Sequence, residues 1–234
     1  MRVAAAKAIQ LDPLLAEAHD ALGMVYARDG QWEQSEKSLR RAIQLDPGRS
    51  MSYSRLALYL LLPLGRIGEA VHWLHIAEKA DRLSAEIQFD LGYILISADR
   101  YEEASGHCQK LPADYPDKRQ CLGRARFGQG KTDEAIQLLA TDRLIDRGFL
   151  GYVYGRAGRR EEAKALAAAV SQEPLPQAVV FAGLGDKDRT LVALERTASL
   201  GPFRLGGVLT YPELTLVRGD PRVKTLRKKV GLPE

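Results

Sequence analysis

The hexapeptide Ala-Ile-Gln-Leu-Asp-Pro occurs twice near the start of the chain, at residues 8–13 and 42–47, and the two copies lie 34 residues apart. A period of this length is typical of helix-turn-helix units, which cannot bury their apolar faces alone and must stack on one another. The chain is therefore predicted to be a helical repeat protein. Its function is predicted to lie in a surface rather than in a catalytic pocket.

Two further series of residues mark the same repeat along the chain. The turn position holds glycine in five of six cases, because a backbone without Cβ is unstrained there: Gly30, Gly65, Asp99, Gly130, Gly158 and Gly185. Five residues beyond each turn lies a small side chain that can pack between helices: Ser35, Ala70, Ala104, Ala135, Ala163 and Thr190. Both series have spacings of 35, 34, 31, 28 and 27 residues, which predicts shorter second helices in the later units.

The stretch between the two hexapeptides resembles a tetratricopeptide repeat (TPR) unit. The residues that carry this resemblance are Leu22, Gly23, Tyr26, Gly30, Trp32, Ala42 and Pro47. The resemblance covers roughly residues 1–200, weakens along the chain, and implies an all-α fold, a right-handed α-solenoid of stacked helix-turn-helix repeats. We expect a half repeat at 1–13, about six helical hairpins up to residue 200, and a C-terminal helical cap at 201–234 in the same domain.

The second repeat departs from the pattern. Arg82 stands where a proline is expected, and one extra residue lies near Pro63. We expect a distorted turn in this repeat and an unchanged fold.

Both ends of the chain carry information. Residues 1–13 match only the second helix of a unit, which leaves an apolar face at Val3 and Ile9 without a partner helix. Terminal repeats need a polar outer side, so we expect either truncation from a longer protein, which we favour, or self-association through this face. The segments 182–188 and 219–222 resemble the C-terminal TPR region of bacterial multidomain regulatory and signalling proteins.

Composition predicts a soluble, cytoplasmic protein with no membrane partner. Of the 234 residues, 45% are hydrophobic and 27% are charged, which is enough apolar material for a continuous core. The longest apolar run, at 56–64, is far shorter than the roughly 18 residues that a membrane span requires. No charged-then-apolar signal segment opens the chain. Cys108 and Cys121 are expected to be reduced thiols, with Cys108 in a buried apolar position.

No pattern in the sequence predicts an enzyme, a cofactor or a metal site. Residues 125–132 match a loose phosphate-binding loop, but a predicted helix precedes Gly130 where that loop needs a strand. His72 and His75 lie one helical turn apart and His107 lies in the next unit, yet nothing in the sequence brings three or four ligands together. No serine or cysteine nucleophile stands beside a histidine base with an orienting partner.

The C-terminal stretch is basic, with one acidic residue, Asp220, among six cations: Arg218, Arg222, Lys224, Arg227, Lys228 and Lys229. One hypothesis is therefore a nucleic-acid-associated module that uses this helix. We favour a solvated helix end, since aromatic side chains that could stack on bases are absent from the stretch. Nucleic acid is thus an alternative partner, not the expected one.

The TPR resemblance implies that the first helix of each unit lines the concave side of the solenoid. The residues that it places in a partner-binding groove are Met24, Leu58, Phe89, Tyr93, Arg124, Phe127, Tyr152 and Arg156. This row is apolar and aromatic with arginines at intervals, which would suit a protein or peptide ligand with alternating hydrophobic and acidic side chains. The alternative is that the aromatic row packs internally and leaves little open groove.

Overall fold

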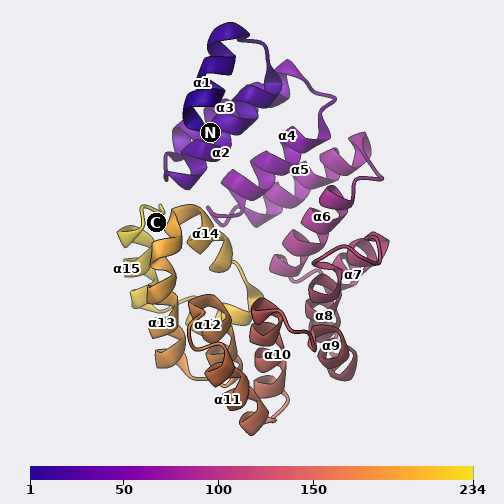
Figure 1. Cartoon of the computed structure of the whole chain (residues 1–234), viewed down its shortest axis with the longest axis vertical. Helices are drawn as coiled ribbons and strands as arrows, with labels where there is room; N and C mark the ends of the chain where they lie inside the picture. The colour runs from indigo at the N-terminus through magenta and orange to yellow at the C-terminus, as the bar shows by residue number, and fades with distance from the viewer. Residues whose placement is uncertain (234) are drawn as a thin grey trace.

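The computed structural model describes residues 1–233, and every regular element in that range is helical. A single helix, α1 (Arg2–Leu11), is followed by six hairpins that stack side by side along an arc (Figure 1). The hairpins are α2 (Ala16–Arg28) with α3 (Trp32–Leu45), α4 (Ser50–Arg55) and η1 (Leu56–Leu61) with α5 (Ile67–Ala80), α6 (Ala85–Ser97) with α7 (Tyr101–Lys110), α8 (Lys118–Gly128) with α9 (Thr132–Leu139), α10 (Leu144–Arg156) with α11 (Arg160–Ala169), and α12 (Pro174–Gly183) with α13 (Lys187–Arg196). The predicted α-solenoid of helical repeats is confirmed.

The turn series and the small-residue series both fall where they were predicted. All six turn residues have positive φ, between 58° and 82°, and Asp99 is the one residue other than glycine in 1–233 that does. All six small residues are fully buried between helices. The second helices α3 and α5 have 14 residues each, whereas α7, α9, α11 and α13 have 8 to 10. The shrinking spacing is therefore a shortening of the second helices.

The turn of the second repeat is not distorted, contrary to expectation. In all six hairpins the residue after the turn donates its N–H to the carbonyl five residues earlier, as Arg66 does to Leu61 at 2.8 Å and Gln31 to Tyr26 at 2.8 Å. The extra residue near Pro63 is absorbed one turn earlier, where η1 is a π-helix. A π-turn adds a residue to a helix without breaking it, so the hairpin geometry is retained.

Cys108 and Cys121 form a disulfide, so the expectation of reduced thiols is wrong. Helices α7 and α8 place the two Cα atoms 5.8 Å apart, within the range that a disulfide spans. Gly92 on α6 makes room for the bridge, because a Cβ there would lie 2.6 and 2.7 Å from the two sulfur atoms. The expected burial of Cys108 is confirmed.

The chain then turns back along the inside of the arc. The last elements are η2 (Thr197–Leu200), α14 (Gly201–Val208), η3 (Pro212–Val217) and α15 (Pro221–Lys229). We call residues 201–217 the return segment. In Figure 1, α14 lies beside the N-terminal hairpins, and the indole of Trp32 donates a 2.9 Å hydrogen bond to the Gly231 carbonyl. The two ends of the solenoid therefore meet.

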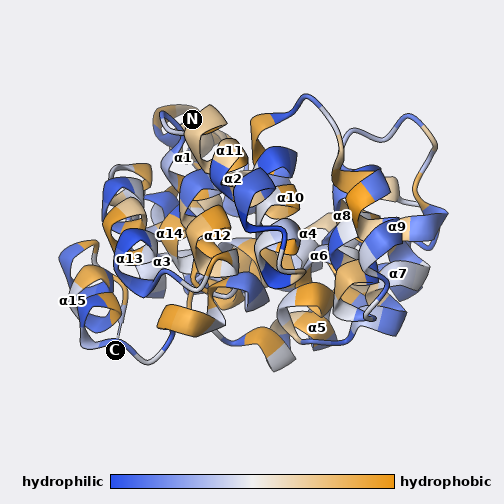
Figure 2. Cartoon of the chain, turned by 90° about the horizontal axis from the view of Figure 1, so that it is seen from below, coloured by the Kyte–Doolittle hydropathy of each residue, from blue (hydrophilic) through white to orange (hydrophobic). Residues whose placement is uncertain are grey.

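Hydrophobic and hydrophilic residues alternate along individual helices (Figure 2), as expected when each helix turns one face to the core and another to water. Within residues 1–233, no helix combines the length and the apolar character that crossing a membrane requires.

Candidate binding surface on the concave face

The first helices of all six hairpins line the inside of the arc, and each of them contacts the return segment. Helix α14 packs on α2 and η1, and η3 packs on α12. Between these ends, Tyr211 meets Tyr93 of α6 and Phe149 of α10, with ring centroids 6.0 and 5.9 Å apart. Glu213 meets Arg124 of α8. Much of the concave face is thus covered by the chain itself.

Arg124 is occupied by a carboxylate of this chain. Its Nε donates to Glu213 Oε1 at 2.8 Å and its Nη2 donates to Oε2 at 2.9 Å. The two side chains are 2% and 8% exposed, so this bidentate pair is shielded from water. Arg124 offers no free charge to a partner while the return segment is in place.

Aromatic rings enclose the same guanidinium. Its central carbon lies 4.2 Å from the ring centroid of Phe149, 4.5 Å from that of Tyr211 and 5.9 Å from that of Tyr93. Burial by itself would lower the pKa of Arg124, but the adjacent Glu213 carboxylate outweighs it and raises this pKa. On the concave face, the Arg124 guanidinium is therefore held by one carboxylate and three aromatic rings.

The other predicted groove residues have different surroundings. Phe127 and Tyr152 are half-buried and contact each other edge to face, with ring centroids 5.6 Å apart. Met24 is half-buried on α2, and Arg156 is exposed at the end of α10. The alternative that the aromatic row packs internally thus applies to the region around Arg124, where the return segment covers the concave face.

One part of the concave face stays open. A pocket of about 420 Å³ lies between η1, α6, α12 and α14, and we call it the inner pocket. Three predicted groove residues, Leu58, Phe89 and Tyr93, line it together with Tyr59, Leu62, Pro63, Asp90, Leu175, Leu200, Phe203, Arg204, Gly207, Val208 and Tyr211. Its walls are mostly aliphatic and aromatic, and Phe203 stacks on Tyr59 at 4.7 Å.

Asp90 is the one carboxylate in the lining of the inner pocket. The residue is 4% exposed, and the Ser54 hydroxyl donates a 2.5 Å hydrogen bond to its Oδ2. Burial raises the pKa of Asp90 to about 7, although the Ser54 hydrogen bond acts in the opposite direction. No Lys, Arg or His in residues 1–233 forms an ion pair with this carboxylate.

Sequence reasoning missed Glu213, Asp90 and Phe203, which shape the concave face. Glu213 and Phe203 lie in the segment predicted to be a C-terminal helical cap, and the sequence pattern does not predict its return along the concave face. Asp90 stands between the large apolar side chains of Phe89 and Leu91, so a charge with apolar neighbours on both sides is the signal that the sequence offers.

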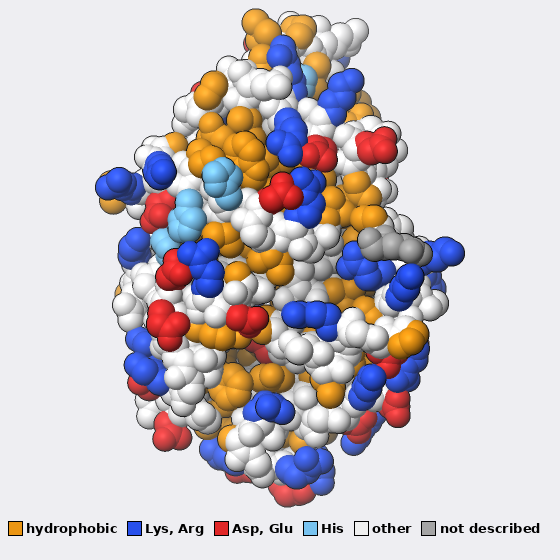
Figure 3. All heavy atoms as spheres, turned by 180° about the vertical axis from the view of Figure 1, so that it is seen from behind, with side chains coloured by type: hydrophobic (Ala, Val, Ile, Leu, Met, Phe, Trp, Pro, Cys, Tyr) orange, Lys and Arg blue, Asp and Glu red, His pale blue; other side chains and the backbone are white. Residues whose placement is uncertain are grey.

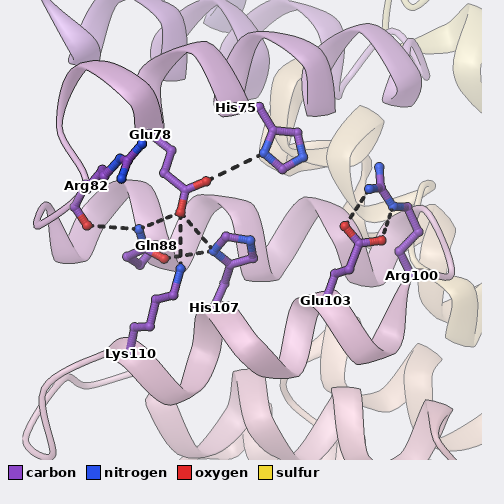
Figure 4. Close-up of polar contacts among 8 residues, drawn as sticks. All are labelled: His75, Glu78, Arg82, Gln88, Arg100, Glu103, His107 and Lys110. Carbon is purple, nitrogen blue, oxygen red and sulfur yellow. Dashed lines mark hydrogen bonds and ion pairs between the residues drawn. The ribbon is translucent and has the colours of Figure 1, made fainter.

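The outer face carries a separate polar cluster around Glu78. The structure brings His75 and His107 together, with ring centroids 6.3 Å apart, a pairing that the sequence pattern does not predict. Glu78 lies within 3.7 Å of His75, 3.6 Å of His107 and 3.2 Å of Lys110 (Figure 4). Figure 3 shows histidine side chains close to acidic and basic side chains on one face of the molecule.

This cluster joins α5, α6 and α7. Gln88 donates to Glu78 at 3.1 Å and accepts a 2.8 Å hydrogen bond from His107 Nδ1. Burial alone would raise the pKa of Glu78, but the hydrogen bonds from Gln88 and Lys110 lower it on balance. The pKa of His107 is lowered, chiefly by burial. Within residues 1–233 no three His, Cys, Asp or Glu side chains are arranged to hold a metal ion.

Two further surfaces bear on the predicted partners. In the basic C-terminal helix, Arg222 pairs with Asp188 at 2.9 Å and with Asp220 at 3.1 Å. The nucleic-acid alternative stays a prediction that salt dependence would test.

At the other end of the solenoid, Val3 is 84% exposed and Leu14 is 68% exposed. Self-association through that face also stays a prediction.

Comparisons with known proteins agree with this architecture. Two family models described as tetratricopeptide repeat match residues 16–49 and 55–118, which span the first hairpin and most of the next two. No curated protein matches the sequence.

Solved structures share the fold at low sequence identity. A tetratricopeptide repeat protein from Parabacteroides merdae has a TM-score of 0.71 and 15% identity, with 97% of this chain and 90% of that chain covered. The structure of PilF from Pseudomonas aeruginosa has a TM-score of 0.58 and 19% identity, covering 82% and 95%. The Cut9–Hcn1 hetero-tetramer of the APC/C has a TM-score of 0.57 and 12% identity, covering 97% and 51%.

Proposed function

Because this chain is a tetratricopeptide repeat protein, we propose that it is a non-enzymatic scaffold that binds a peptide or partner protein in the concave face of its solenoid. We further propose that it belongs to a bacterial signalling or transcription-regulatory protein. Residues 1–200 would form the binding solenoid, and 201–234 its helical cap in the same domain, with the return segment as the part of this cap that runs along the concave face.

The inner pocket is the observation that carries this proposal. Leu58, Phe89 and Tyr93 present apolar and aromatic surface to an opening of about 420 Å³, which is within the range of about 300–1,000 Å³ that ligand pockets occupy. Large apolar side chains in such a recess are the usual anchors of a protein interface. A partner would insert its anchor residue between η1, α6 and α14. The Cut9–Hcn1 hetero-tetramer supports the proposal, since a protein of similar fold takes part in an assembly of different chains.

Selection of peptides against the whole chain tests the proposal. A phage-displayed library of random 12-residue peptides is selected on the wild type, and the affinities of synthetic copies are measured by fluorescence anisotropy. Phe89→Ala removes one ring from the pocket wall and is expected to weaken binding about tenfold or more. Leu83→Ala is the control, because Leu83 is 94% exposed and does not line the pocket. Selected peptides that bind both variants as tightly as the wild type would place recognition elsewhere on the molecule.

A further inference from the structure

The inner pocket contains half of an ion pair. Asp90 is almost fully buried in a wall of aliphatic and aromatic groups, and its hydrogen-bond donor within residues 1–233 is the Ser54 hydroxyl. A carboxylate that is withdrawn from water without a cation is unfavourable, and such groups in folded proteins are paired as a rule. The fold therefore retains an acidic group here that a ligand could neutralise.

Aromatic rings line the same pocket as this carboxylate. Phe89 precedes it in the chain, and the Phe89 ring centroid lies 6.2 Å from that of Tyr93 and 5.5 Å from that of Tyr115. Tyr59, Phe203 and Tyr211 complete the aromatic part of the lining. The face of an aromatic ring attracts a cation, most strongly where water is excluded. The rings and the carboxylate thus favour the same kind of guest.

The neighbouring wall shows how this molecule holds a cation. Arg124 lies among Tyr93, Phe149 and Tyr211 and is paired with the Glu213 carboxylate. Tyr93 and Tyr211 also line the inner pocket, where the carboxylate is Asp90 and a cation is the missing component. The two sites share two rings and one type of acidic group. Arg124 is already paired with Glu213 and does not neutralise Asp90. A partner that neutralises Asp90 must therefore bring a positive charge.

We propose that the inner pocket receives a lysine or arginine side chain of a partner segment, whose cation pairs with Asp90 among the aromatic rings. This inference rests on the proposed function, because it specifies the side chain that the concave face recognises. Leu58, Leu62 and Val208 provide the aliphatic surface on which the methylene groups of that side chain pack.

Arg204 modulates this recognition. It is exposed, lines the inner pocket from α14, and does not form an ion pair with Asp90. Its positive charge repels an incoming cation, since like charges near a low-dielectric site raise each other's energy. Arg204→Gln is therefore expected to strengthen binding of a basic peptide severalfold, whereas Asp90→Asn weakens it.

The peptides selected on the wild type provide the probes. For each peptide, a set of analogues is made in which a single lysine is replaced by norleucine or a single arginine by citrulline. The affinities of these analogues for the wild type and for Asp90→Asn are measured by fluorescence anisotropy. One replacement is expected to weaken binding to the wild type about tenfold or more and to leave binding to Asp90→Asn unchanged. Replacement in the peptide leaves the protein unaltered, so a folding defect in Asp90→Asn cannot mimic the effect.

The outcomes separate the two proposals. Peptides that are weakened by Phe89→Ala but bind Asp90→Asn and their own neutral analogues as tightly as before would retain the concave-face function and overturn the cationic specificity. Peptides that bind Phe89→Ala as tightly as the wild type would overturn both proposals. Lysine- or arginine-dependent binding that Asp90→Asn abolishes, and that Arg204→Gln strengthens, supports the inference.

Discussion

Replacing Glu213 by glutamine tests whether the return segment is held by its buried ion pair. The substitution keeps the size of the side chain but removes the charge that faces Arg124 across bonds of 2.8 and 2.9 Å. The guanidinium then stays charged in a site where its side chain is 2% exposed. Breaking a buried pair by removing one partner costs about 3–5 kcal/mol.

The rings around Arg124 reduce that loss. Phe149 and Tyr211 lie 4.2 and 4.5 Å from the guanidinium carbon and continue to attract it in the variant. A glutamine can also accept one hydrogen bond from the guanidinium through its amide oxygen. We therefore expect the lower end of the range, a decrease of about 3 kcal/mol in the free energy of unfolding.

Arg100 and Glu103 supply a matched control on the surface. Their bonds have the same bidentate geometry, at 2.8 and 2.5 Å, but the two side chains are 42% and 49% exposed. Glu103→Gln is expected to cost less than about 1 kcal/mol, because water and salt screen exposed pairs. The difference between the two variants isolates the effect of burial.

Urea unfolding followed by circular dichroism and by tryptophan fluorescence measures both variants. Trp32 reports on the docking of the chain's end, since its indole donates to the Gly231 carbonyl at 2.9 Å. If Glu213→Gln releases the return segment before the repeats unfold, the fluorescence transition moves to lower urea than the circular dichroism transition. Equal losses for Glu213→Gln and Glu103→Gln would refute the docked, water-excluded ion pair.

Three other perturbations have expected outcomes. Burial raises the pKa of Asp90 from 3.8 to about 7, and the nearby Glu86 charge adds to this, so the folded protein keeps a proton that the unfolded chain loses. The free energy of unfolding should then fall as pH rises from about 4 to about 7. In urea unfolding at pH 8, Asp90→Asn should be more stable than the wild type by up to roughly 4 kcal/mol, because each pKa unit corresponds to about 1.36 kcal/mol. The cysteines of the disulfide are 13 residues apart, and its reduction should lower the free energy of unfolding of the wild type by about 3 kcal/mol. Parallel thermal melts with and without dithiothreitol measure this loss, and Cys121→Ser should melt at the same temperature in both. Gly183→Ala puts a Cβ 2.5 Å from the Tyr152 Cα and should cost about 1–3 kcal/mol in urea unfolding, whereas Gly106→Ala meets no atom within 4 Å and should gain about 0.5–1 kcal/mol.

The features that sequence reasoning recovered are local ones. A turn residue with positive φ and a small residue five positions later are each set by contacts within one hairpin, so the series from Gly30 to Gly185 could be followed without coordinates. The π-turn in η1 shows the limit of this approach. An extra residue near Pro63 was visible, but whether the turn or the helix absorbs it depends on how the two helices pack.

The features that it missed join distant segments. Glu213 pairs with a residue 89 positions earlier, and Gly231 accepts a hydrogen bond from a residue 199 positions earlier. Cys108 and Cys121 are near in sequence, yet their pairing depends on the angle between α7 and α8 and on the space beside Gly92. In the concave face, the repeat pattern predicts which residues point inward, but only the course of the return segment decides which of them stay accessible.

The return segment both covers the concave face and builds its remaining site. Phe203, Arg204 and Tyr211 belong to it and line the inner pocket. A ligand of that pocket should therefore stabilise the docked return segment, because a ligand that binds one state shifts the equilibrium toward it by RT ln(1 + [L]/Kd). For Glu213→Gln, a peptide at 100 times its Kd should restore about 2.7 kcal/mol, close to the loss expected from the variant. Restoration of the Trp32 fluorescence transition by a selected peptide would confirm this coupling. A peptide that binds Glu213→Gln and the wild type with equal affinity, without moving that transition, would show that the pocket does not need the return segment.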